Sequence, residues 1–247
     1  MKINPSIPTH QQHNAKSQLT KTVVRPDIIV HSGILELDTL LGGFKAGEIV
    51  YIDGRSNLIS DIPNQLCVHT YRTFNSDTIY IDGGICADPY KIAKYARIME
   101  INQHDVLNHV QISRAFTVYQ LSTFIEHILE KEIKKHNPRT LIIGKFPALY
   151  LDTDVPKKES QIILKNCLQK LQKLTSKYNL ITVLTNVDGR LYSHHMRKTI
   201  QEYVNETVQM RYIEPCTYVD LVKRQKSATI FSMADGQLRL DHFGLVM

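Results

Sequence analysis

The residues that come closest to phosphate chemistry lie in the stretch GRSNLISD, Gly54–Asp61, directly after the apolar run GEIVYID. A buried strand that runs into a glycine here is typical of a phosphate-binding loop, G-x-x-x-x-G-K-[ST]. Such a loop wraps the phosphates in backbone N–H groups, its lysine reaches the β and γ phosphates, and its Ser or Thr holds Mg²⁺. The first question is therefore whether this stretch can still bind a nucleotide.

The residue types that do the chemistry of such a loop are missing. Counting from Gly54, Ile59 stands at the second glycine, Ser60 at the lysine and Asp61 at the Ser or Thr. A carboxylate at Asp61 would repel phosphates in a pocket of low dielectric constant. The stretch is therefore expected to be a vestigial loop that binds no nucleotide.

A second alignment does not restore the motif. Anchoring the loop on residues 65–67 shifts it by three positions and puts Pro63 and Asn64 where the Lys and Thr belong. What remains of the loop is Gly54, Arg55, Ser60 and Asp61. No catalytic residue and no cofactor are expected, although ATP binding in a non-standard pose stays open.

The surrounding chain alternates short apolar strands with amphipathic helices. Strands are expected at residues 48–54, 78–84, 109–113, 139–146 and 179–186, and helices at residues 62–74, 88–99, 118–136 and 160–178. From residue 206 onward the pattern changes to short strands joined by turns, one of them at residues 234–237. This order predicts an α/β fold with a mainly parallel central sheet, helices on both faces and a C-terminal antiparallel β extension.

Local signals mark several element ends. Gly42 and Gly43 are expected to stop a short helix, where a left-handed C-cap is needed. Asp88 is the expected N-cap of the helix that begins with Pro89. The helix at residues 62–74 is expected to have Ser60 or Asp61 as its N-cap.

Two helices carry clear apolar faces. The helix at 118–136 is expected to bury Leu121, Phe124, Ile125 and Ile128, and the helix at 160–178 to bury Leu164, Cys167, Leu168, Leu171 and Leu174. Residues 1–25 are polar and are expected to form a flexible arm, which leaves residues 26–247 as a single core domain.

Composition narrows the class of protein. The chain has 247 residues, 43% of them hydrophobic, and neither a secretory signal nor an apolar run of membrane-spanning length is expected. Its four cysteines show no C-x-x-C spacing, and the pair His194–His195 lacks a third ligand, so no metal site is expected. These features predict a cytoplasmic protein with reduced thiols, and its net charge of +6 mildly favours a polyanionic partner.

The order of segments resembles the core of the RecA/RadA recombinases. The residues that carry the resemblance are SGILELDTLLGGFKAGEIVYIDG, TIYIDGG, the stretch 96–121 that includes RAF, PRTLIIGKFPALYL, LQKLTSKYNLITVLTN and ADGQLRL. They run from about Asp27 to the C-terminus. The resemblance implies a RecA-like core, and an alternative is that GRSNLISD is a turn in an unrelated α/β protein.

The departures from that family fall on its catalytic positions. Gly83–Gly84 stand where the family has Thr-Glu, Gly144 stands at the Walker B aspartate, and Asn186–Val187 replaces the Asn-Gln pair. A general base alone contributes about 10²- to 10⁴-fold in rate. The resemblance therefore implies a degenerate, archaeal-type RadA paralog that lacks Walker motifs and is not an enzyme.

The same resemblance implies where DNA would bind. The family's two DNA loops correspond to residues 147–160 and 187–199. The candidate side chains are Lys157, Lys158, Arg190, Tyr192, His194, His195, Arg197 and Lys198. Cations neutralise phosphates and tyrosines stack on unpaired bases, so single-stranded DNA is the expected ligand. Two ordinary solvated loops are the alternative.

The sequence thus favours an accessory in DNA recombination or repair that binds single-stranded DNA, a recombinase or RecA-fold paralog, or both. The Phe-x-x-Ala motif by which recombinases link subunits is not evident in the N-terminal arm. Two alternatives stay open: an architectural subunit of a RecA-fold assembly, homo-oligomers included, and a KaiC-like regulator that binds ATP.

Overall fold

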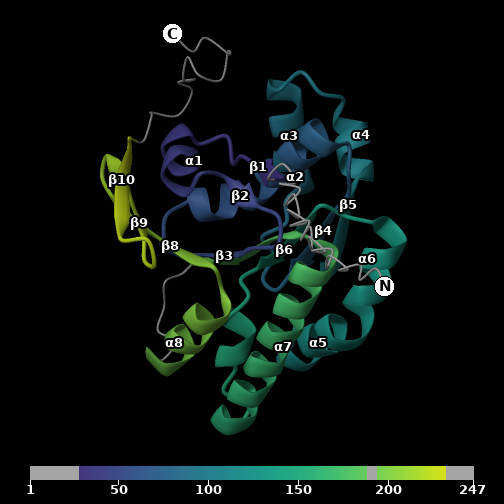
Figure 1. Cartoon of the computed structure of the whole chain (residues 1–247), viewed down its shortest axis with the longest axis vertical. Helices are drawn as coiled ribbons and strands as arrows, with labels where there is room; N and C mark the ends of the chain where they lie inside the picture. The colour runs from purple at the N-terminus through teal and green to yellow at the C-terminus, as the bar shows by residue number, and fades with distance from the viewer. Residues whose placement is uncertain (1–27, 188–193, 232–247) are drawn as a thin grey trace, which may run out of the picture.

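A computed structural model describes residues 28–187 and 194–231 of the protein. Its main sheet has eight strands in the order β10-β9-β8-β3-β7-β6-β4-β5 (Figure 1). The strands are β3 Ile49–Arg55, β4 Thr78–Asp82, β5 Val110–Arg114, β6 Thr140–Gly144, β7 Ile181–Asn186, β8 Glu206–Ile213, β9 Cys216–Leu221 and β10 Lys226–Phe231. The pairs from β8 to β5 are parallel, and β9 and β10 extend the sheet antiparallel. The predicted α/β fold is confirmed.

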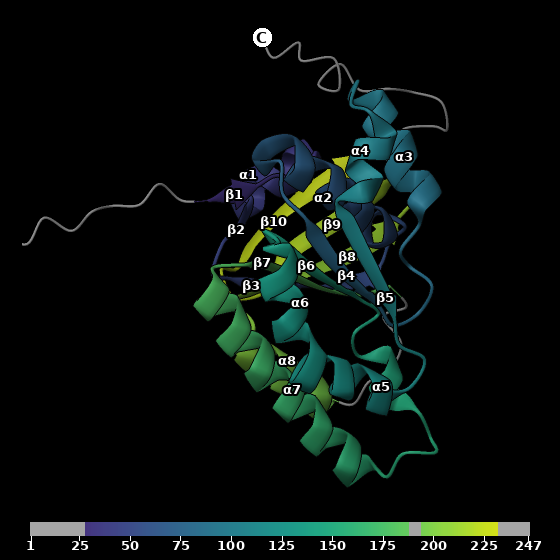
Figure 2. The same cartoon turned by 90° about the vertical axis from the view of Figure 1, so that its right-hand side faces the viewer.

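Helices cover both faces of the sheet (Figures 1 and 2). One layer holds α1 Leu35–Leu41, α2 Leu58–Phe74, α3 Pro89–Ile98 and α4 Gln103–Asn108, and the other holds α5 Val118–Thr123, α6 Leu129–His136, α7 Lys157–Tyr178 and α8 His194–Tyr203. A separate pair, β1 Ile29–Val30 and β2 Phe44–Lys45, flanks α1. Each face of the sheet has its own hydrophobic core, one under α2 and one under α7. Because side chains alternate along a strand, Val50 and Ile52 point into the core under α2, and Ile49 and Tyr51 point into the core under α7.

The predicted ends of two helices are confirmed. Gly42 ends α1 in the left-handed conformation, and the Asp88 carboxylate accepts N–H bonds from Tyr90 and Lys91 at the start of α3. The predicted N-cap of α2 is wrong: Asn57 occupies that position, so Ser60 and Asp61 lie inside the first turn. Both the arm at 1–25 and the turn at 234–237 fall outside the described residues.

A π-helical turn, η1 Phe124–Ile128, corrects one predicted apolar face. It joins α5 to α6 and adds one residue to a helical turn. Residues spaced by four positions therefore lie on the same side of the helix. Leu121, Ile125 and Leu129 are therefore buried, whereas Ile128 is 39% exposed. The apolar face predicted for the helix at residues 160–178, which corresponds to α7, is confirmed in full. Within the described residues, no helix is both long and apolar enough to cross a membrane.

His69 on α2 makes stability depend on pH. Burial lowers the pKa of His69 to about 4, and its Nε2 has no hydrogen-bond partner among the described residues. Between about pH 6.5 and pH 4, His69 is protonated in the unfolded chain but stays neutral in the folded chain. We therefore expect the free energy of unfolding to fall by about 1–3 kcal/mol as the pH is lowered through this range. The His69→Leu variant should lose this pH dependence in urea unfolding, whereas His104→Gln, at an exposed position, should keep it. An equal acid sensitivity in both variants would refute the assignment.

Candidate functional site

The connection from β3 to α2 occupies the position expected for the phosphate loop, and it is too short for one. Only Ser56 and Asn57 separate Arg55 at the end of β3 from Leu58 at the start of α2. Gly54 lies opposite Met210 of β8, and a Cβ at Gly54 would overlap the Met210 carbonyl oxygen. Gly54 therefore serves the close approach of β3 and β8.

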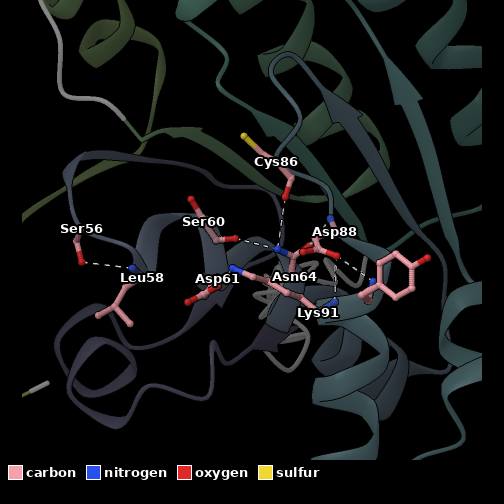
Figure 3. Close-up of polar contacts among 9 residues, drawn as sticks. Ser56, Leu58, Ser60, Asp61, Asn64, Cys86, Asp88 and Lys91 are labelled. Atoms are coloured by element: carbon pink, nitrogen blue, oxygen red, sulfur yellow. Dashed lines mark hydrogen bonds and ion pairs between the residues drawn. The ribbon is translucent and has the colours of Figure 1, made fainter. Parts of the chain in front are cut away.

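The first N–H groups of α2 are bonded within the chain. Leu58 donates to the Ser56 hydroxyl at 3.3 Å (Figure 3), and Ile59 donates to the Ser56 carbonyl at 3.2 Å. Ser60 donates to the carbonyl of Asn57 at 3.0 Å. In a phosphate loop such N–H groups point at the ligand. Here these three groups are used to start the helix.

The Asp61 carboxylate, expected to repel phosphate, has a cation beside it. Lys91 reaches across from α3 to Asp61 (Figure 3), and its Nζ lies 2.7 Å from Asp61 Oδ1. This contact raises the pKa of Lys91. Asn64 strengthens the same junction, because its amide donates to the Ser60 carbonyl and accepts the N–H of Asp88. Side chains thus tie the start of α2 to α3 at this point.

The positions of the missing carboxylates are closed by neighbouring atoms. At Gly144, a Cβ would lie 3.2 Å from the Tyr80 ring and 3.2 Å from the Cys86 Cβ. At Gly83, a Cβ would lie 2.9 Å from the Gly144 carbonyl oxygen, and at Gly84 it would overlap the Lys145 side chain. These three glycines allow tight packing at the carboxyl ends of β4 and β6. The residues present therefore do not fit a Mg²⁺–triphosphate group.

Two buried aspartates remain at this edge of the sheet, and both are engaged. Asp53 at the end of β3 accepts the Asn186 side-chain amide at 3.0 Å, and the Arg197 guanidinium of α8 lies 3.8 Å from it. Asp82 at the end of β4 accepts the N–H groups of residues 84, 86 and 87 and lies 3.6 Å from Arg114. These contacts hold loops and α8 onto the sheet.

A basic surface lies where α7 and α8 begin. Lys157 and Lys158, predicted in a loop, occupy the first turn of α7, and both are exposed. The second predicted loop is also shorter than expected, because α8 begins at His194 and includes the exposed His195 and Lys198. We call Lys157, Lys158, His195 and Lys198 the basic surface. The two helices contact each other and lie side by side in Figure 1.

Residues 24–200 match the model of the protein family described as Rad51. The match extends over more than half of the chain and includes every strand of the parallel core except β8. This chain belongs to the Rad51 family. No curated protein matched the chain in a separate search. The sequence-based assignment to RecA/RadA-like recombinases is thus confirmed at the family level, while the loss of its catalytic chemistry stays a prediction.

The predicted DNA-binding residues of this Rad51-family chain fall into three groups. Arg190, Tyr192 and the side chain of His194 lie outside the described residues. Lys157, Lys158, His195 and Lys198 form the basic surface. Arg197 turns toward the sheet edge, where it contacts Asp53, with 38% of its side chain exposed.

Three further side chains of types that can contact DNA, Tyr150, Lys170 and Lys177, are used within the fold. Tyr150 is buried and packs on Phe146 with ring centroids 5.3 Å apart, so its ring is not available for stacking on a base. Lys170 and Lys177 both contact Glu130, at 3.0 and 2.8 Å, and these contacts lower the pKa of Glu130 to about 2. Their shared helical face therefore serves the packing of α7 on α6.

Lys91 pairs with Asp61, and Tyr80 and Cys86 pack against Gly144; none of the three was expected from the sequence. Lys91 pairs with Asp61 from 30 positions along the chain. Tyr80 lies within a strand whose residues are all buried, where a tyrosine looks like an ordinary core residue. The signal for this close packing in the sequence was the presence of glycine at positions 83, 84 and 144, because glycine allows other atoms to approach the backbone closely.

Proposed function

We propose that this Rad51-family chain is an accessory in DNA recombination or repair that binds single-stranded DNA and does not turn over ATP. The observation that carries the proposal is the state of the phosphate position. The first N–H groups of α2 are bonded within the chain, and the Asp61 carboxylate is paired with Lys91. Glycines stand at the positions where the family has carboxylates. Function then rests on the remaining surface of the recombinase fold.

The basic surface supports the DNA part of this proposal. The positive end of a helix dipole disfavours cations in the first turn by about 0.3–1 kcal/mol each. Lys157 and Lys158 nevertheless stand in the first turn of α7, and His195 stands in the first turn of α8. A phosphate backbone would relieve this repulsion, because both helix N-termini and lysines attract anions.

Loss of two lysines should weaken binding in a salt-dependent way. We expect Lys157→Ala with Lys158→Ala to lower affinity for oligodeoxythymidylate at least about tenfold at low salt. The slope of log affinity against log salt should shrink by about 1.4, since each phosphate contact on a single strand contributes about 0.7. Fluorescence anisotropy across a salt series measures both.

The matched control removes two exposed cations from α3, on the other helical layer. The Lys94→Ala and Arg97→Ala double variant loses the same charge and should keep both affinity and slope. If the wild-type protein does not bind the oligonucleotide at low salt, the DNA proposal is wrong. An equal loss in the control would mean that net charge alone governs binding.

The proposed lack of ATP turnover has its own test. A ligand that binds only the folded state at 100 times its Kd would stabilise it by about 2.7 kcal/mol. We expect millimolar Mg²⁺–ATP to leave the Tm unchanged and no phosphate to be released. Phosphate release that is lost on substitution of residues 54–64 would refute the proposal, and measurable ATP affinity without release would favour a regulator that binds ATP.

A second candidate function, a subunit of a RecA-fold assembly, has an observation in its favour. Ile85, Tyr90 and Phe116 are 77%, 88% and 69% exposed, and they follow the carboxyl ends of the neighbouring strands β4 and β5. Exposed apolar side chains grouped on one edge are typical of protein contacts. Light scattering after size exclusion should find a stable oligomer without DNA if this function holds, and a monomer if it does not.

A further inference from the structure

A groove runs between α7 and α8, next to the basic surface. It encloses about 440 Å³ and is lined by the first two turns of α7 and the length of α8. This volume lies within the range of about 300–1,000 Å³ that small-ligand sites occupy. Lys158 belongs both to the groove and to the basic surface, so the two are continuous.

Positive charge and an exposed apolar side chain share the α7 wall of the groove. Lys158 and Lys165 are seven residues apart and therefore lie on the same face of the helix. Between them Ile162 is 62% exposed. A cation at either side of an exposed apolar surface suits a ligand with a flat apolar part and an anionic part.

The α8 wall gives the groove a direction. His195 stands at the first turn, and Glu202 and Tyr203 stand at the other end of the helix. Along α8, the Glu202 carboxylate would repel a phosphate, so one anionic group belongs at the His195 end, near Lys158, and a second belongs against α7 at Lys165. The hydroxyl of Tyr203 accepts a hydrogen bond from Gln169 of α7 at 3.3 Å, which fixes the ring at the far end.

We infer that this groove takes one unpaired nucleotide of a DNA strand, its base against Ile162 and Tyr203 and its phosphates beside Lys158, Lys165 and His195. The inference rests on the proposed function, because the strand reaches the groove from the basic surface. A partner helix is disfavoured as the occupant, since helix-binding grooves offer a continuous row of apolar anchors. Along this wall of α7, lysines flank the single exposed isoleucine.

The test compares groove variants on two probes, a twelve-nucleotide oligodeoxythymidylate and the same oligomer with abasic sites. Lys165→Ala should lower affinity for the first probe about three- to tenfold and reduce the salt slope by about 0.7. Ile162→Ser should weaken the thymidylate by about threefold or more and leave the abasic probe unchanged, since stacking needs a base. Both positions are exposed, so the variants should keep the wild-type Tm.

Lys131→Ala on α6 is the charge-matched control and should behave as wild type. If Lys157→Ala with Lys158→Ala abolishes binding while Lys165→Ala and Ile162→Ser change nothing, the groove inference is wrong and the proposed function stands. If Ile162→Ser weakens both probes equally, the base does not lie in the groove, and the inference is also wrong. If the wild type binds neither probe, both the inference and the DNA proposal fail.

Discussion

The Gly54→Ala variant should lose about 2–6 kcal/mol of unfolding free energy in the absence of any nucleotide. The added Cβ would overlap the carbonyl oxygen of Met210, to which Gly54 lies opposite in the β3–β8 pair. Forcing atoms into a packed interior costs about 1–3 kcal/mol, and strained backbone conformations cost a similar amount. The φ of Gly54 is +138°, a value that side-chain-bearing residues rarely adopt. Both costs therefore apply together.

Gly42→Ala is the matched control for this prediction. Gly42 also has a positive φ of +77°, but a Cβ there would meet nothing within 4 Å. Only the backbone cost of about 1–2 kcal/mol should remain. Urea unfolding followed by circular dichroism measures both variants. Equal losses in the two variants would contradict the packing role of Gly54.

The result separates two roles for a glycine at the end of β3. In a phosphate loop a glycine lets the backbone approach the ligand, so its replacement should act mainly on nucleotide affinity. In this chain the near neighbour is the β8 backbone, so its replacement should act on folding. A Gly54→Ala variant that folds normally would reopen the question of a bound nucleotide.

Much of the fold could be predicted because the spacing of apolar residues along the sequence indicates which positions are buried. The strands from β3 to β7 are short, apolar and separated by helices. Few folds other than a parallel sheet covered by helices on both faces are compatible with such a pattern. Helix starts were harder, since both Asn57 and Ser60 are polar residues suited to a cap. The π-turn at Phe124–Ile128 was not visible, because it shifts the helical period by one residue.

The candidate site was predictable in what it lacks but not in what fills it. Single positions, such as Gly144 at the end of β6, can be compared with a motif one by one. The pairing of Asp61 with Lys91, and of Asp53 with Arg197, joins residues 30 and 144 positions apart. Only the packed chain decides which of many cations meets which carboxylate. Arg197 was accordingly expected at DNA, whereas the structure places it against a buried carboxylate.

The Asp82→Ala variant should lose about 2–4 kcal/mol of unfolding free energy, because a buried carboxylate organises the loop after β4. Its side chain is fully buried and accepts N–H bonds from Gly84, Cys86 and Ala87 at 2.9–3.3 Å. Removing it leaves those donors without their acceptor, and unsatisfied buried groups cost about 1–3 kcal/mol each, less where the loop can relax toward water. Asp82→Asn should cost less, since one side-chain oxygen still accepts.

Asp88→Ala provides the comparison within the same loop. Asp88 caps α3, and loss of an N-cap costs about 1 kcal/mol. Cys86 supplies a local readout, because its thiol is half-buried and its N–H is held by Asp82 at 2.9 Å. Reaction of Cys86 with a thiol reagent should therefore be faster in Asp82→Ala than in Asp88→Ala. Equal rates would mean that Tyr80 and the glycine contacts, and not Asp82, keep the loop after β4 closed.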